Sequence, residues 1–123
     1  MPKVDLNIKM NTNGEIRDFS VVGIRTDDII KYVDEDSHIE VDLLNKKIIT
    51  DNEDYTNMLT FDIDTVTILS YKLKKLDKEM ELSIKTNKLE VDNNKFIVEY
   101  EVLDDSNTIS NVNYELYIGG IHG

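Results

Sequence analysis

Imidazole chemistry is limited to two side chains, because His38 and His122 are the only histidines in the sequence. A metal site, haem ligation or proton transfer near neutral pH would have to use one of them. Neither has a partner at a spacing typical of metal ligands, and His122 lies beside the C-terminus, where fraying is expected. His38 stands in an acidic neighbourhood, which favours its protonated form. The sequence therefore predicts solvated histidines and no metal or haem site.

Carboxylates are abundant and gather in four short clusters that could attract Ca²⁺ or Mg²⁺. The clusters are residues 34–36, 51–54, 62 with 64, and 104–105. Each falls in or beside a predicted turn, where aspartate and asparagine are favoured for backbone reasons. None has the layout of a calcium loop, with its central glycine and terminal glutamate. We therefore interpret these clusters as structural turns.

Nucleophilic catalysis finds no support in the sequence. A hydrolase would need a serine or cysteine beside a histidine base, or paired carboxylates placed in a cleft. The chain has no cysteine, and Ser83 and Ser110 fall in predicted strands without a Gly-x-Ser-x-Gly motif. A phosphate-binding glycine loop and a dinucleotide fingerprint are also missing. We expect a protein that is not an enzyme and carries no cofactor.

The composition indicates one globular domain, residues 1–123, with 40% hydrophobic and 32% charged residues. Fourteen Lys and Arg residues against 25 Asp and Glu residues give a net charge of -11. Such a field repels phosphate backbones and anionic lipids, so we expect neither nucleic acid nor a membrane as a partner. The lack of cysteine, of a signal-peptide pattern and of an apolar run of about 18 residues favours a cytoplasmic location.

The elements that would position any site are strands. Residues 80–118 alternate apolar and polar side chains almost without interruption, which is typical of strands with one buried face. A two-residue turn at 93–94 sets the register of a hairpin in which apolar residues face each other. The pairs that this register predicts are Val91 with Phe96, Leu89 with Val98, and Lys88 with Glu99.

The alternation changes phase within the first strand of this hairpin. Apolar residues are even-numbered up to Ile84 and odd-numbered from Leu89 onward. A bulge of one residue near Thr86 and Asn87 would restore the phase. Beyond the bulge, this register pairs Ile84 with Val102 and Lys85 with Glu101.

Short predicted strands, with a turn signal about every ten residues, fill the rest of the chain. The first two should pair, with a second phase change between Ile16 and Val22 that predicts a bulge, and with Gly23 relieving a bend. Residues 72–78 are too short for an isolated helix and are expected to form a loop or strand end. Short connections between neighbours favour an up-and-down barrel over a Greek-key sandwich. We predict an all-β fold, a small antiparallel up-and-down β-barrel of about eight to ten strands.

Segments of the C-terminal half resemble the YwiB-like family of uncharacterised calycin-like (lipocalin-like) proteins. The matching segments are residues 80–91, 96–102 and 114–120. Thr86 follows a Leu-x-Ile strand as in that family, and the closing strand runs into Gly119 and Gly120. Gly23 also matches a family glycine, whereas residues 25–28 are short and polar in place of an aromatic-rich hairpin. The resemblance implies a small closed barrel related to ligand carriers, without agreed site residues.

One face of the C-terminal strands should point into the barrel and supply any ligand-binding residues. The candidates are Leu82, Ile84, Val98, Tyr100, Tyr114 and Leu116. The two tyrosines favour a partly polar interior, because each buried hydroxyl needs a partner. Barrels of about eight strands are either plugged by side chains or wide enough for one small ligand. Both alternatives stay open at this stage.

These observations lead to two functional hypotheses. The first is an uncharacterised cytosolic barrel that binds a small apolar or amphipathic ligand in its interior. The alternative is a non-catalytic structural or protein-interaction module with a filled core, which would dock a partner through exposed Leu103 and Tyr117. Nothing in the sequence indicates the oligomeric state.

Overall fold

Ten strands and no helix make up the structure, a computed structural model that describes the backbone of residues 2–122 and the side chains of residues 2–120. No helix within this range is long and apolar enough to cross a lipid bilayer. The strands are β1 (Lys3–Thr12), β2 (Glu15–Thr26), β3 (Ile29–Asp34), β4 (Ser37–Asp42), β5 (Lys47–Asp51), β6 (Tyr55–Thr60), β7 (Thr67–Leu73), β8 (Lys78–Asp92), β9 (Lys95–Asp104) and β10 (Asn107–His122).

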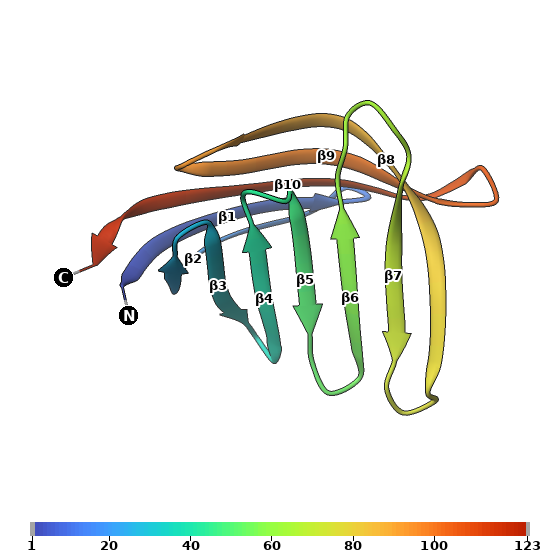
Figure 1. Ribbon diagram of the computed structural model, residues 1–123, viewed down its shortest axis with the longest axis horizontal. Coiled ribbons are helices and arrows are strands. Elements are labelled where there is room, and N and C mark those ends of the chain that lie inside the picture. Colours follow the sequence, from blue (N-terminus) through green and yellow to red (C-terminus); the bar gives the residue numbers. More distant parts are fainter. Residues whose placement is uncertain (1, 123) are drawn as a thin grey trace.

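The strands form a closed antiparallel barrel in which each strand pairs with its neighbours in the chain, and β1 closes the ring by pairing with β10. The predicted all-β up-and-down barrel is therefore confirmed. Figure 1 shows β3 to β7 crossing in front of β1, β9 and β10 at a steep angle. Two strands, β2 and β8, bend between these two directions and form the corners of the barrel.

The corner in β8 is a β-bulge at the predicted place. All five predicted pairs between β8 and β9 are present, from Val91 opposite Phe96 to Ile84 opposite Val102, and the register shifts between Thr86 and Lys88. Residues 78–84 pair with β7, and of these Ser83 and Ile84 also pair with β9, whereas residues beyond the bulge pair with β9 alone. The extra residue thus bends the strand where it leaves one sheet direction for the other.

The corner in β2 differs from the prediction. We expected a bulge between Ile16 and Val22, but β2 pairs with β1 in an unbroken register over this stretch. Ile16 and Val22 are exposed on the outer face, while Phe19 and Val21 pack against the core. The apparent change of phase therefore comes from apolar side chains that point outward, and the backbone stays regular.

Gly23 marks the place where β2 passes close to β3. A Cβ atom on Gly23 would lie 2.6 Å from the carbonyl oxygen of Lys31 and 2.6 Å from Leu6 Cδ1. The two strands pair over only three residues of each, from Ile24 to Thr26 on β2. Glycine is needed here because it lets the two backbones approach.

Apolar side chains fill one end of the barrel, which we call the closed end, around Phe96, Ile30 and Val41. Phe96 is fully buried, and its ring centroid lies 6.0 Å from that of Phe61 and 6.4 Å from that of Tyr114. These edge-on contacts are a preferred arrangement of aromatic rings. These side chains form the apolar core of the barrel.

A buried carboxylate organises the turn between β4 and β5. Asp42 Oδ1 accepts hydrogen bonds from the backbone N–H groups of Leu44 (3.0 Å) and Asn45 (2.9 Å), and Asn45 Nδ2 donates to Asp42 Oδ2 (2.8 Å). Burial alone would raise the pKa of Asp42, but these hydrogen bonds and nearby Lys47 outweigh it and hold the pKa below its usual value.

Replacing Asp42 by asparagine is expected to lower the free energy of unfolding by about 1–3 kcal/mol, because charge-assisted hydrogen bonds are lost. A carboxylate with a lowered pKa in the folded state stabilises the protein above its unfolded-state pKa, and this contribution disappears as the pH falls through the folded-state value. Urea titrations should therefore show the largest difference between wild type and D42N near pH 7 and a closing gap below pH 3.8, the usual aspartate pKa. A gap that does not change with pH would contradict this role.

Candidate functional site

The end of the barrel opposite the closed end contains a cavity of about 560 Å³. Its mouth is formed by two turns, residues 35–36 between β3 and β4 and residues 52–54 between β5 and β6. The walls carry Ile39, Ile48 and Leu59 on one side, and the side chains of tyrosines project from other strands. The barrel interior is therefore filled at one end and hollow at the other. This arrangement combines the two alternatives of the sequence analysis, an interior plugged by side chains and one wide enough for a small ligand.

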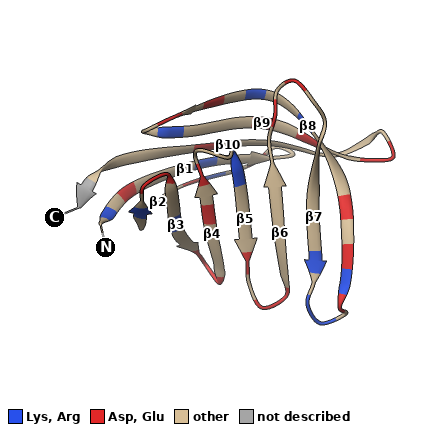
Figure 2. Ribbon diagram, viewed as in Figure 1, with Lys and Arg blue, Asp and Glu red and all other residues tan. Residues whose placement is uncertain are grey.

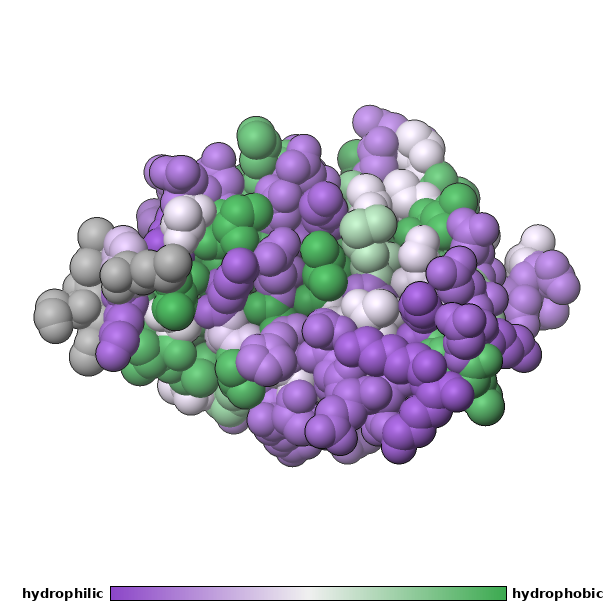
Figure 3. All heavy atoms as spheres, turned by 60° about the horizontal axis from the view of Figure 1, so that its bottom comes forward, coloured by the Kyte–Doolittle hydropathy of each residue, from purple (hydrophilic) through white to green (hydrophobic). Residues whose placement is uncertain are grey.

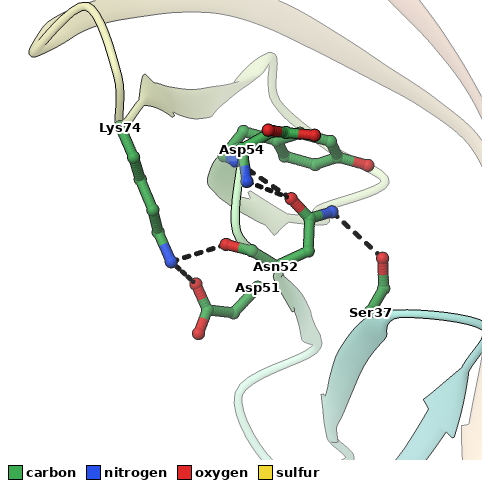
Figure 4. Close-up of polar contacts among 6 residues, drawn as sticks. Ser37, Asp51, Asn52, Asp54 and Lys74 are labelled. Carbon is green, nitrogen blue, oxygen red and sulfur yellow. Dashed lines mark hydrogen bonds and ion pairs between the residues drawn. The ribbon is translucent and has the colours of Figure 1, made fainter.

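Hydrogen bonds hold the turns of the mouth together, as Figure 4 shows. Asn52 Nδ2 donates to Ser37 Oγ (3.0 Å), which joins the β5–β6 turn to β4. Lys74 Nζ lies 2.6 Å from both Asp51 Oδ1 and the Asn52 carbonyl oxygen, which joins the β7–β8 turn to the same place. Asn52 Oδ1 also accepts from the N–H groups of Asp54 and Tyr55. Three hairpins are thus fixed relative to one another at the rim.

A side-chain ion pair takes the place of backbone pairing between β2 and β3 at the cavity wall. Pairing of these strands stops at Ile24 opposite Lys31, so β2 and β3 diverge toward the mouth. Arg17 on β2 donates two hydrogen bonds to Asp34 on β3, at 2.8 and 2.9 Å, and both residues line the cavity. The hydrogen bond to Asp34 raises the pKa of Arg17. The pair closes the gap while leaving both groups charged.

Tyrosine hydroxyls meet at the boundary between the cavity and the closed end. The Tyr32 and Tyr114 hydroxyl oxygens are 2.9 Å apart in a buried hydrogen bond, although the residues lie 82 positions apart in the chain. Burial raises the pKa of Tyr32 to about 12, with the hydrogen bond to Tyr114 acting in the opposite direction, and raises the pKa of Tyr114 well above its usual value. Burial likewise raises the pKa of Tyr100 to about 12. All three phenols are therefore neutral at physiological pH.

Polar atoms without partners lie on the inner side of the barrel. Asn57 Oδ1 and Thr86 Oγ1 are buried and make no hydrogen bond with any described residue. Asn57 lines the cavity, whereas Thr86 lies at the bulge of β8, opposite Tyr100 on β9. The Tyr100 ring packs against Phe61 at 4.9 Å, and its hydroxyl has no hydrogen-bond partner among residues 2–120. Buried polar groups in folded proteins are rarely left unsatisfied, so Asn57 Oδ1 and Thr86 Oγ1 call for an explanation.

The structure divides the six residues predicted to face a ligand. Tyr100 and Tyr114 line the cavity. The other four pack in or against the apolar core and lie outside the cavity lining. These four are Ile84, Val98 and Leu116, which are fully buried, and Leu82, which is half-buried.

Sequence reasoning missed most of the cavity wall, including Arg17, Tyr32, Asp34 and Asn57. Part of the signal was present, because Tyr55, Leu59 and Phe61 lie at even spacing with Thr56 and Thr60 between them, although Asn57 and Met58 invert the pattern in the middle. The inward side chains of β6 could have been read from this pattern. The pattern does not indicate how deep along the barrel axis each of these side chains lies.

His38 lies apart from the cavity, and one of the acidic clusters has a contact typical of a structural turn. His38 is exposed on the outer face of β4, and the side chain of His122 lies outside the described residues. Asp62 Oδ1 accepts from the Asp64 N–H at 3.0 Å, a contact within a turn. In residues 2–120, no three carboxylate or imidazole groups converge in a way that could hold a metal ion.

Comparisons with known proteins give one structural likeness. No family model matches the sequence, and no curated protein matches it. The crystal structure of ywiB protein from Bacillus subtilis is similar to this chain, with a TM-score of 0.48 and 16% sequence identity. The likeness covers 97% of this chain and 92% of the other. It is too remote to indicate a ligand or an activity.

Proposed function

We propose that this protein is a cytosolic, calycin-like barrel that binds one small amphipathic molecule in the cavity behind the mouth. The observation that carries the proposal is the cavity itself, about 560 Å³ in a barrel whose other end is tightly packed. Ligand pockets in proteins commonly measure about 300–1,000 Å³ and combine apolar walls with a few polar groups. The cavity meets both criteria.

The distribution of side chains supports an amphipathic ligand. Ile39, Ile48 and Leu59 provide an apolar surface that an alkyl or aromatic body would cover. Asn57 and Tyr100 add polar atoms that have no partner within the described residues. A ligand with an apolar body and one polar group would satisfy both surfaces.

Binding fits the cavity better than catalysis. Tyr32, Tyr100 and Tyr114 line it and are neutral at physiological pH, because burial raises the pKa of Tyr32 and Tyr100 to about 12 and that of Tyr114 well above its usual value. A neutral phenol donates or accepts hydrogen bonds but is a poor nucleophile. Among the described lining residues, no serine lies beside a histidine.

The proposal predicts saturable, one-to-one binding of the neutral fluorescent probe N-phenyl-1-naphthylamine. Thr50 lines the cavity, so replacing it with tryptophan should fill the space and weaken binding at least tenfold. Replacing Ser70, which is exposed on the outer face of β7, with tryptophan is the control and should leave the affinity unchanged. Fluorescence titration reports both affinities. Equal binding by wild type and T50W, or no saturable binding by wild type, would refute the proposal.

A second candidate function is docking of a protein partner on the outer face of β2 and β3. Val22, Ile24 and Val33 line a shallow groove there and are exposed. Figure 3 shows apolar patches on a face of the molecule that is otherwise largely hydrophilic. Leu103 and Tyr117, which the sequence indicated for this role as exposed residues, are half-buried in the structure. Native mass spectrometry of the freshly purified protein distinguishes the candidates, because it reports the masses of retained ligands and subunits together.

A further inference from the structure

We propose that the ligand is an amphipathic amine, whose ammonium group binds at the depth of Asn57 beneath an acidic mouth. The inference rests on the proposed function, since it names the chemical class of the molecule held in the same cavity. It follows from an unpaired hydrogen-bond acceptor, the charge of the rim and the aromatic side chains of the wall.

Asn57 supplies the acceptor. It pairs with Thr50 on β5 and Tyr71 on β7, and its side chain shares the inner face of β6 with buried Leu59, while Met58 is exposed outside. Its Oδ1 atom is buried and receives no hydrogen bond from any described residue. An apolar residue at this position would avoid the cost of an unsatisfied acceptor. The asparagine is therefore suited to a donor that comes from a ligand.

The charge of the rim selects a cation. Asp34, Glu35, Asp36 and Asp54 line the cavity, and the only described cation among the lining residues is Arg17. That guanidinium is held by both oxygens of Asp34, and Asp54 Oδ1 lies 3.4 Å from Lys75 Nζ. Among the described lining carboxylates, Glu35 and Asp36 are therefore the two without an ion pair. Figure 2 shows the acidic residues on the β3–β4 and β5–β6 turns that form the mouth. A carboxylate ligand would be repelled there, whereas an ammonium ion would be attracted.

The wall supplies further groups for an ammonium ion. A primary ammonium has three N–H donors and no acceptor, which matches Asn57 Oδ1 and the unpaired hydroxyl oxygen of Tyr100. The tyrosine rings offer faces that attract cations. Because the phenols are neutral, they contribute no charge of their own. The apolar part of the amine would cover Ile39 and Ile48.

Three probes with the same alkyl chain and different head groups test whether the ligand is an amine: decylamine, decanol and decanoate. Each is used below its micellar concentration at pH 7 and low salt. Displacement of N-phenyl-1-naphthylamine should need at least tenfold less decylamine than decanol, and decanoate should be weakest. Equal or tighter binding of decanol or decanoate would overturn the amine assignment while leaving the binding function intact. If neither the fluorescent probe nor any decyl compound bound, the proposed function itself would fail.

Two sets of variants locate the head group. Asn57→Leu should weaken decylamine binding at least fivefold and retain the fluorescent probe. Glu35→Gln with Asp36→Asn should weaken decylamine binding about tenfold at low salt, with decanol unaffected. Neither of these turn side chains makes a hydrogen bond or ion pair with residues 2–120, so the double variant should fold normally. Unchanged decylamine affinity in the double variant would overturn the inference, even if the Asn57 variant did not fold.

A matched control changes the net charge by the same amount elsewhere. Asp104→Asn with Asp105→Asn neutralises two carboxylates at the β9–β10 turn, which lies outside the cavity lining. Asp105 has a φ of 48° and Glu35 a φ of 54°, so each turn contains a non-glycine residue with left-handed backbone, and the β9–β10 turn has a second one in Ser106. The control should bind decylamine like wild type. A loss equal to that of the Glu35 and Asp36 variant would indicate attraction by overall charge and would overturn the local site.

Discussion

Replacing Phe96 by alanine is expected to lower the free energy of unfolding by about 3–5 kcal/mol. Phe96 is fully buried at the closed end, where its ring contacts those of Phe61 and Tyr114. Removing it deletes buried apolar surface and leaves a hole that strands on both sides of the barrel would have to close. Guanidinium titration followed by circular dichroism measures the loss.

A control distinguishes this effect from a general loss of β propensity. Ile16 is 73% exposed on β2, so Ile16→Ala should change the free energy of unfolding by no more than about 0.5 kcal/mol. The slope of the titration should be similar in both variants if only stability changes. A loss below about 1 kcal/mol for Phe96→Ala would show that the closed end is loosely packed, contrary to the structure.

Gly23→Ala is expected to cost about 1–3 kcal/mol, although it adds a single methyl group. The added carbon would lie 2.6 Å from Leu6 Cδ1, which can move, and 2.6 Å from the Lys31 carbonyl oxygen, which belongs to the backbone of β3. Relief requires β2 and β3 to separate where only a few residues pair. We expect the thermal midpoint to fall and the amide hydrogens of this corner to exchange faster.

Gly120 provides the matching control. A methyl group added at Gly120 would have no neighbouring atom within 4 Å, so Gly120→Ala should be close to neutral. Hydrogen exchange of both variants, followed residue by residue, separates the two outcomes. If the amide hydrogens at the β2–β3 corner of the Gly23→Ala variant exchanged at the wild-type rate and its thermal midpoint were unchanged, the two strands would not approach as closely as described.

Periodicity and turn spacing predicted the arrangement of the strands because both act between neighbours. The β8–β9 register, with its bulge after Thr86, follows from matching apolar residues across one short turn. The same rule failed in β2, because exposed Ile16 and Val22 imitate a change of phase. A pattern of apolar residues shows which side chains face the barrel interior only where the residues on the outer face are polar.

The cavity was less predictable because its depth depends on residues from distant strands. Alternation correctly placed Tyr100 and Tyr114 on the inner face, but nothing local distinguished their level from that of Val98 or Leu116. The contact between Tyr32 and Tyr114 exists only because the barrel closes. The level of each side chain along the barrel axis follows from the tilt of strands that are not neighbours.

The pairing of β1 with β10 also determines when the barrel can close during folding. Lys3 lies opposite His122, so the first strand gains its second partner only after the last strand is available. During synthesis, β1 and β9 would each present an open edge capable of pairing with another chain. Such long-range closure slows folding. We therefore expect refolding yield to fall steeply with protein concentration, and truncation of β10 to produce aggregation instead of a smaller folded barrel.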